Sequence, residues 1–159
     1  MMQLVDTLAI QDQMPDQPCW GCGPGNRQGL HLKSYWSGVG TICTWRPEPH
    51  HVGWPGVLNG GVLAALVDCH CVCTAVADSY PVEGRTPDTQ PPIWFATGSL
   101  NISYLKPVPV DAPVQLNATI TERTPRKTRI ECVVMSSDEV CARAEVVAVR
   151  IARQLGSPA

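Results

Sequence analysis

The feature that most constrains the fold is the apolar stretch 58–79, LNGGVLAALVDCHCVCTAVADS, which contains no proline. A stretch of this length without a helix breaker is typical of a long α-helix. Its Leu, Val, Ala and Cys residues would surround most of the helix circumference, so other parts of the chain must enclose it. The sequence therefore predicts one long helix inside a layer of other structure.

Strand-like segments flank this helix. They are 30–36 and 39–47 before it, and 93–105, 114–122, 128–136 and 140–152 after it. Ser37 and Gly38 suit the turn of a hairpin between the first two. In 114–122 apolar residues alternate with polar ones, which is typical of a sheet with one face in water. The order predicts an α+β fold in which one antiparallel sheet curls around one central helix.

A chain of 159 residues fits a single domain. Residues 15–29, PDQPCWGCGPGNRQG, are too rich in Gly and Pro for a regular element. We therefore expect residues 1–27 to form an N-terminal extension or covering loop, and residues 28–155 to form the domain.

Charge and composition exclude several classes of partner. The formal net charge is -2, only 16% of residues are charged, and no basic stretch occurs, so we expect neither a nucleic-acid nor a membrane partner. The first residues, MMQLVDTLAIQDQMP, lack the features of a secretion signal, which predicts a cytoplasmic protein. The eight cysteines are then expected to be reduced thiols.

Two strings of the sequence resemble a known family. GVLNGGVLAALVD and TGSLNISYLKPVPV are similar to the hotdog-fold acyl-CoA thioesterases of the PaaI-like branch. In that branch a His-Gly-Gly signature opens the helix and an acidic residue follows nine positions after the His. Here Asn59 replaces that His, Gly60 and Gly61 follow it, and Asp68 stands at the ninth position. Thr97, four residues before Asn101, matches a family Thr or Ser, and CWGCGPGNRQGLHL resembles the stretch before the first strand.

The resemblance implies a hotdog fold and hydrolysis of an acyl-CoA or acyl-carrier-protein thioester. It implies no cofactor other than the coenzyme A of the substrate. It also implies a homodimer, or a dimer of dimers, whose sites form across the subunit interface.

Gly60 and Asp68 have the chemistry for this reaction. The Gly60 N–H at a helix N-terminus can bind the oxygen of an acyl carbonyl, and Gly61 can contact the substrate beside it. Asp68, two turns further on, can act as general base or nucleophile on that carbonyl. Asp68 can instead be a buried acid that a neighbouring hydroxyl or backbone group satisfies, and Asn59 can either cap the helix or hydrogen-bond the thioester.

Strand alternation places Thr97 on the polar face with Ser99, away from the core of its own subunit. It could then orient a catalytic water only from the partner subunit. An ordinary strand threonine is the alternative.

Further candidates for substrate binding are His51, Trp54, Lys106, Arg126 and Lys127. The three cations could meet the phosphates of coenzyme A, although charged turns are usually only solvated. His51 and its neighbour His50 stand in a Pro-rich loop, where paired histidines are more often only exposed. We expect His70, on another helix face than Asp68, to be structural.

A metal site is a weaker interpretation. Cys19-x-x-Cys22 has the spacing of zinc ligands, and Cys69, Cys71 and Cys73 add thiols. No second Cys-x-x-Cys completes the set, and Cys71 lies across the helix from the other two. The sequence therefore predicts no metal.

Two other functions stay open. The same fold and substrate could serve a lyase, such as a dehydratase, a hydratase or an enzyme of conjugate addition. The chain could also be an acyl-CoA-binding module without catalysis.

Overall fold

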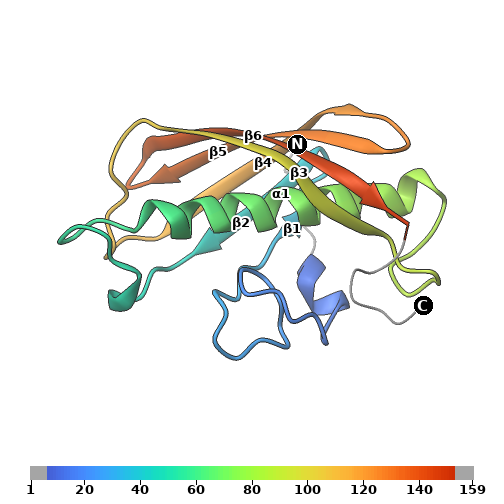
Figure 1. Ribbon diagram of the computed structural model, residues 1–159, viewed down its shortest axis with the longest axis horizontal. Helices are drawn as coiled ribbons and strands as arrows, with labels where there is room; N and C mark the ends of the chain where they lie inside the picture. Colours follow the sequence, from blue (N-terminus) through green and yellow to red (C-terminus); the bar gives the residue numbers. More distant parts are fainter. Residues whose placement is uncertain (1–6, 153–159) are drawn as a thin grey trace.

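A computed structural model describes residues 7–152 (Figure 1). Its elements are η1 (Ile10–Gln13), β1 (Tyr35–Trp36), β2 (Gly40–Trp45), η2 (Pro49–His51), α1 (Gly60–Val82), β3 (Trp94–Tyr104), β4 (Val114–Arg123), β5 (Lys127–Ser136) and β6 (Glu139–Ile151). The strands form one sheet in the order β1-β2-β4-β5-β6-β3, and every neighbouring pair is antiparallel. The predicted α+β fold, one antiparallel sheet around one long helix, is confirmed.

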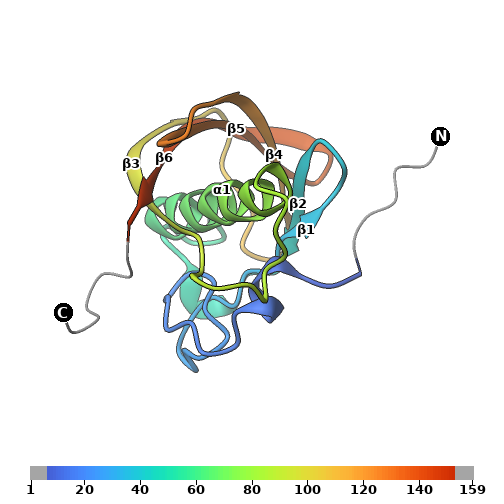
Figure 2. The same ribbon diagram turned by 90° about the vertical axis from the view of Figure 1, so that its right-hand side faces the viewer.

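The sheet curves around α1, and the N-terminal segment covers the side of the helix that the sheet leaves open (Figure 2). Leu66, Val67 and Cys71 are fully buried in this enclosure. Length and composition would also let α1 cross a membrane, but more than half of its apolar stretch is buried inside the protein. It is the core helix that the sequence predicts.

The helix begins one residue after Asn59, whose side-chain oxygen accepts hydrogen bonds from the N–H groups of Gly61 and Val62 at 2.8 and 3.2 Å. Asn59 is therefore the N-cap. The helix also continues three residues beyond the predicted end at 79. Tyr80 holds this last turn, because its side chain is buried and its hydroxyl accepts a hydrogen bond from the Ile93 N–H at 3.0 Å.

The first predicted strand is much shorter in the structure, since only the end of 30–36 pairs with β2. Leu30 and Leu32 donate their N–H groups to Trp20 and Gly21 of the N-terminal segment at 2.7 and 3.1 Å. These residues therefore hold the covering segment in place instead of extending the sheet. Within 15–29 the structure contains turns only, as expected.

The domain limits at residues 28 and 155 stay predictions. Residue 155 and the first six residues of the predicted covering loop lie outside the described part of the chain.

Strand β3 forms one edge of the sheet. It pairs with β6 on one side, and no other strand of residues 7–152 lies along its second side. Most of its eleven residues, including Ser99, Leu100 and Asn101, are exposed. A long strand edge with free backbone groups is a surface on which another strand can pair.

Candidate functional site

Asp68 and Thr97 form the central contact of the candidate site. The Thr97 hydroxyl donates a hydrogen bond to one carboxylate oxygen of Asp68, with 2.5 Å between the oxygens. Among the described residues the Asp68 carboxylate has no other hydrogen-bond partner and no cation beside it. One oxygen of this partly buried acid is therefore free to accept a proton or to attack a carbonyl carbon.

The placement of Thr97 on the polar face was wrong. The pairing of β3 with β6 shifts between Thr97 and Ser99, which is a β-bulge at Gly98. Thr97 pairs with the buried Ala148, whereas Leu100, two residues beyond the bulge, pairs with the buried Val146. Because the extra residue interrupts the alternation, Thr97 faces α1 in its own chain and needs no partner subunit to reach Asp68.

The Asp68 carboxyl lies on a cavity of about 270 Å³ between α1, the start of β3 and the N-terminal segment. Its walls are apolar and sulfur-rich; among the lining residues are Met14, Cys19, Cys22, Cys69, Val72, Cys73, Val76, Trp94, Phe95 and Thr97. We call it the Asp68 cavity. The cavity therefore leaves room for a small molecule beside the carboxylate.

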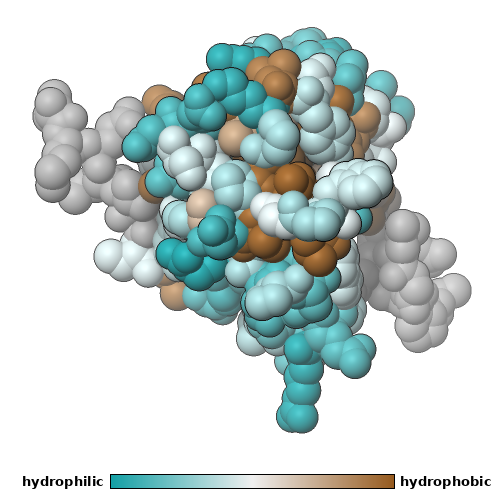
Figure 3. Space-filling model, turned by 90° about the vertical axis from the view of Figure 1, so that its left-hand side faces the viewer, coloured by the Kyte–Doolittle hydropathy of each residue, from teal (hydrophilic) through white to brown (hydrophobic). Residues whose placement is uncertain are grey.

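Gly60 lies on a different cavity, of about 640 Å³, at the N-terminal end of α1. Asn59, Trp54 and Lys106 also line this Gly60 cavity, together with Tyr104, whose hydroxyl donates a hydrogen bond to the Gly60 carbonyl at 2.7 Å. Figure 3 views this end of the molecule and shows hydrophobic side chains at its centre with hydrophilic ones around them.

The Gly60 N–H finds no hydrogen-bond acceptor within residues 7–152, because the Asn59 side chain bonds the next two amides instead. The capping role of Asn59 is therefore present in the structure. It leaves the first amide of the helix without an acceptor, at a residue that lines the cavity and at the positive end of the helix dipole.

Within one chain the structure does not bring Gly60 and Asp68 together. Eight residues of α-helix separate them by about 12 Å along the helix axis. The two residues also line different cavities. The expectation that Asp68 reaches a carbonyl held at Gly60 of the same chain is therefore wrong.

The remaining candidates are dispersed. The Gly61 N–H is occupied by Asn59, and Lys106 forms an ion pair with Glu139 at 2.6 Å. His51 lies next to the helix start, where its carbonyl accepts a hydrogen bond from the Asn59 N–H; partial burial and then the neighbouring His50 lower the pKa of its ring. Trp54 is 81% exposed.

Arg126 and Lys127 lie at the β4–β5 turn. Their neighbours Thr124 and Pro125 line a cavity with Val82, so this turn lies at the C-terminal end of α1, away from Gly60. The structure does not place these two cations with the other candidates.

His70 is structural, as expected. It is fully buried, and its two ring nitrogens contact the hydroxyls of Ser34 at 2.8 Å and Thr41 at 3.2 Å. Burial lowers its pKa to about 4, so the ring is neutral near pH 7.

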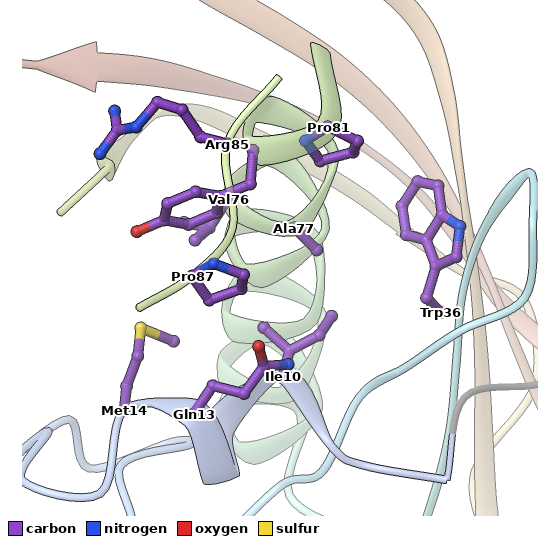
Figure 4. A pocket seen from close by; sticks show the side chains of 10 residues that line it. Ile10, Gln13, Met14, Trp36, Val76, Ala77, Pro81, Arg85 and Pro87 are labelled. Atoms are coloured by element: carbon purple, nitrogen blue, oxygen red, sulfur yellow. The ribbon is translucent and has the colours of Figure 1, made fainter. Parts of the chain in front are cut away.

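Another cavity, of about 250 Å³, lies between η1, β1, the C-terminal half of α1 and the loop after it (Figure 4). Its ionisable lining residues are Tyr80 and Arg85, and Arg85 pairs with Glu83 at 3.2 Å. Among the described residues its lining contains no carboxylate, thiol or imidazole, so it is a weaker candidate than the Asp68 cavity.

Four thiols form part of the wall of the Asp68 cavity, although the sequence favoured no metal site among these cysteines. Cys19 and Cys22 of the N-terminal segment meet Cys69 and Cys73 of α1. Hydrogen bonds from Cys19, Cys69 and Cys73 lower the pKa of Cys22, while bonding to the other thiols and burial raise the pKa of Cys69 and Cys73. The helix spacing of four between Cys69 and Cys73, read beside Cys19-x-x-Cys22, is the signal that could have found this cluster.

Residues 55–143 match the family model described as "Thioesterase superfamily". A crystal structure of a thioesterase superfamily protein from Shewanella loihica PV-4 is similar over 80% of this chain and 97% of that chain, with 34% identity and a TM-score of 0.64. These two findings confirm the hotdog fold that the sequence strings imply.

Curated relatives carry the name acyl-coenzyme A thioesterase THEM4. The rat protein, from Rattus norvegicus, is 26% identical over 110 residues, which cover 69% of this chain and 42% of the rat protein. The Bos taurus protein is 30% identical over 100 residues, which cover 62% of this chain and 35% of the bovine protein. The chain therefore matches less than half of the length of either relative.

Proposed function

The chain belongs to the thioesterase superfamily, and on this premise we propose that it hydrolyses the thioester of an acyl-CoA, or of an acyl-carrier protein, to a carboxylic acid and a free thiol. The observation that carries the proposal is the Asp68–Thr97 contact at the wall of a cavity. The names of the curated relatives support an acyl-CoA substrate. Membership of the PaaI-like branch and a cytoplasmic location stay predictions.

In the proposed reaction Asp68 takes a proton from a water molecule, and the water oxygen attacks the thioester carbon. Thr97 holds one carboxylate oxygen, so the other faces the water. The tetrahedral intermediate then expels the sulfur as a thiolate, which receives the proton from Asp68. General-base catalysis of this kind contributes roughly 10²–10⁴-fold to the rate.

The oxyanion formed during attack needs a donor, and the free Gly60 N–H is suited to this role. Removal of one such donor typically costs about 3 kcal/mol of transition-state stabilisation. Since Gly60 and Asp68 of one chain lie about 12 Å apart, we propose that a substrate carbonyl sits between Asp68 of one subunit and the partner subunit's Gly60.

The open edge of β3 can bring these two residues together. Thr97 near one end of β3 contacts Asp68, and Tyr104 at the other end contacts Gly60. When two copies pair antiparallel along this edge around a two-fold axis between Leu100 and Asn101, Thr97 lies opposite the partner subunit's Tyr104. Each Asp68 then approaches the partner subunit's Gly60, and one dimer contains two equal sites.

Lys106, Arg126 and Lys127 are proposed to bind the phosphates of the nucleotide part of coenzyme A. Lys106 lines the Gly60 cavity, so it is placed to meet a phosphate there. Arg126 and Lys127 are exposed at the other end of α1 and support this role less directly. Lys106→Ala is expected to raise KM for acyl-CoA but not for the same acyl group on pantetheine, which lacks the nucleotide. An equal rise for both substrates would contradict phosphate binding.

The function is tested by measuring free thiol released from a panel of acyl-CoAs. Wild-type protein is expected to release thiol from at least one member, and Asp68→Asn is expected to reduce kcat by at least about 10²-fold without change in the circular dichroism spectrum. Activity of Asp68→Asn close to that of wild type would refute the role of Asp68.

The same panel separates the other two functions. Loss of enoyl absorbance without thiol release would indicate a lyase. Binding of acyl-CoA without any turnover would indicate a binding module, and either result would refute hydrolysis.

A further inference from the structure

Four cysteine side chains from two separate parts of the chain meet beside α1. The sulfurs of Cys19 and Cys69 are 3.6 Å apart, and those of Cys22 and Cys73 are 3.9 Å apart. The sulfurs of Cys19, Cys22 and Cys69 all lie within 4.8 Å of one another, whereas the Cys73 sulfur lies farther than this from at least one of the three. We call Cys19, Cys22, Cys69 and Cys73 the four-thiol cluster. All four are free thiols, since a disulfide would require about 2.05 Å between sulfurs.

The turn at Cys19–Cys22 brings its two cysteines close to α1. The Gly23 N–H donates to the Cys19 carbonyl at 2.8 Å, which closes the turn and directs both cysteines to the same side. Gly21, between them, passes so close to the helix that an added Cβ would lie 2.3 Å from the Cys69 sulfur. A side chain at this position would push the turn away from Cys69.

The helix supplies the other pair. Cys69 and Cys73 are four residues apart, so both side chains lie on the same face of α1. Both are buried, whereas Cys19 and Cys22 are partly exposed. Cys71 is not part of this face: it is buried in the main hydrophobic core, which also contains Cys132 of β5. The cluster therefore has a buried half on a rigid helix and an accessible half on a turn.

The two measured sulfur–sulfur separations match those of a tetrahedral metal site, which Cys73 completes by a small movement toward the other three thiols. Zinc binds thiolate sulfur at about 2.3 Å, which places two sulfurs of a tetrahedron about 3.8 Å apart. The two measured separations, 3.6 and 3.9 Å, lie on either side of this value. An all-sulfur tetrahedral set favours Zn²⁺ over the harder cations Mg²⁺ and Ca²⁺, which prefer oxygen.

The geometry points to a structural Zn²⁺ site formed by Cys19, Cys22, Cys69 and Cys73. Binding releases the thiol protons to solvent, because thiolates are the ligands. The bound ion links the covering segment to α1 across fifty positions of sequence and fixes the wall of the Asp68 cavity. This proposal differs from the sequence-based expectation of no metal, and it does not depend on the proposed hydrolysis.

The test uses the full chain, purified under reductant without a metal-binding tag. Elemental analysis is expected to find one zinc per chain. Replacement by Co²⁺ is expected to give the intense visible and sulfur-to-metal charge-transfer bands of tetrahedral thiolate coordination. Folded wild-type protein with neither zinc after incubation with Zn²⁺ nor these cobalt bands would overturn the proposal.

Variants locate the ligands. Cys22→Ser, on the accessible turn, and Cys73→Ser, on the helix, are each expected to lower the zinc content at least tenfold. Cys43→Ala, a buried cysteine outside the cluster, is the matched control and is expected to keep one zinc. Zinc content unchanged in folded Cys22→Ser would place the metal elsewhere and overturn the assignment.

Proteolysis tests the structural role in wild-type protein alone. Removal of zinc by a chelator is expected to expose residues 15–29 to cleavage, and added Zn²⁺ is expected to reverse this. Cleavage that chelation leaves unchanged would show that the metal does not hold this segment.

Discussion

Thr97 on β3 donates a hydrogen bond to Asp68 on α1, and this contact exists because β3 bulges at the next residue, Gly98. A hydrogen bond to an ionised carboxylate holds the side chain in one orientation, which is what a general base requires. The bulge at Gly98 is therefore what turns the Thr97 hydroxyl toward Asp68.

Loss of the Thr97 hydroxyl tests this orientation. Thr97→Val keeps the shape of the side chain but removes the donor, so kcat for thiol release is expected to fall by roughly thirtyfold, which corresponds to about 2 kcal/mol. Thr97→Ser, which keeps the hydroxyl, is expected to retain most activity. Equal kcat values for Thr97→Val and wild type would show that Thr97 does not position the acid.

The bulge at Gly98 can be changed without replacing Thr97 or Asp68. An added Cβ at Gly98 would lie 2.6 Å from a methyl carbon of Val149, so Gly98→Ala is expected to shift β3 and lower kcat by up to about 10²-fold. Val149→Ala removes that methyl group, and the double variant is expected to recover part of the loss. Full activity of Gly98→Ala would contradict the requirement for this backbone position.

Gly60→Pro removes the proposed oxyanion donor without breaking the helix. Proline is well tolerated at the first helical position, and Asn59 before it already has an extended backbone (φ -60, ψ 129). The loss of kcat is expected to be roughly 10²–10³-fold. Gly60→Ala keeps the N–H, and its Cβ would lie at an ordinary 3.5 Å from the Tyr104 ring, so it serves as the control.

A site shared between subunits predicts complementation. Asp68→Asn and Gly60→Pro each have the strongly reduced kcat expected above when alone, but after mixing and reassembly a heterodimer contains one site with neither change. Thiol release is therefore expected to return on mixing. If no activity returns although exchange of subunits is demonstrated by mass spectrometry, Asp68 and the partner subunit's Gly60 do not share a site.

His70 predicts how stability depends on pH. Its pKa is about 4 in the folded chain and about 6.5 when unfolded, so between these values the unfolded chain binds a proton that the folded chain does not. The folded chain is therefore least affected by this group above pH 6.5. As the pH falls from 6.5 to 4, protonation of His70 in the unfolded chain lowers the free energy of unfolding by about 3 kcal/mol in total. Urea denaturation across this range measures the loss, and a folded His70→Asn variant is expected to show a shallower slope between pH 6.5 and 4.

The chain order of elements and the central helix could be predicted from the sequence because both depend on local patterns. The apolar stretch around Leu66 leaves no polar face for water, and the alternation from Val114 to Ala118 has one buried and one exposed side, as predicted. Asp68 was noticeable as the one carboxylate in the first two-thirds of the apolar stretch 58–79. Each of these signals is contained within a few neighbouring residues.

Tertiary structure decided what those residues contact. A β-bulge leaves no clear pattern in the sequence. Regular alternation therefore placed Thr97 on the wrong face of the strand, because the bulge at Gly98 interrupts that alternation. In the same way, Cys22 and Cys73 are fifty-one positions apart, and only the packing of the covering segment on α1 brings their sulfurs to 3.9 Å. Sequence periodicity thus determined the central helix and most of the strands, whereas the faces next to a bulge and the contacts between distant segments depend on the register and packing of the whole chain.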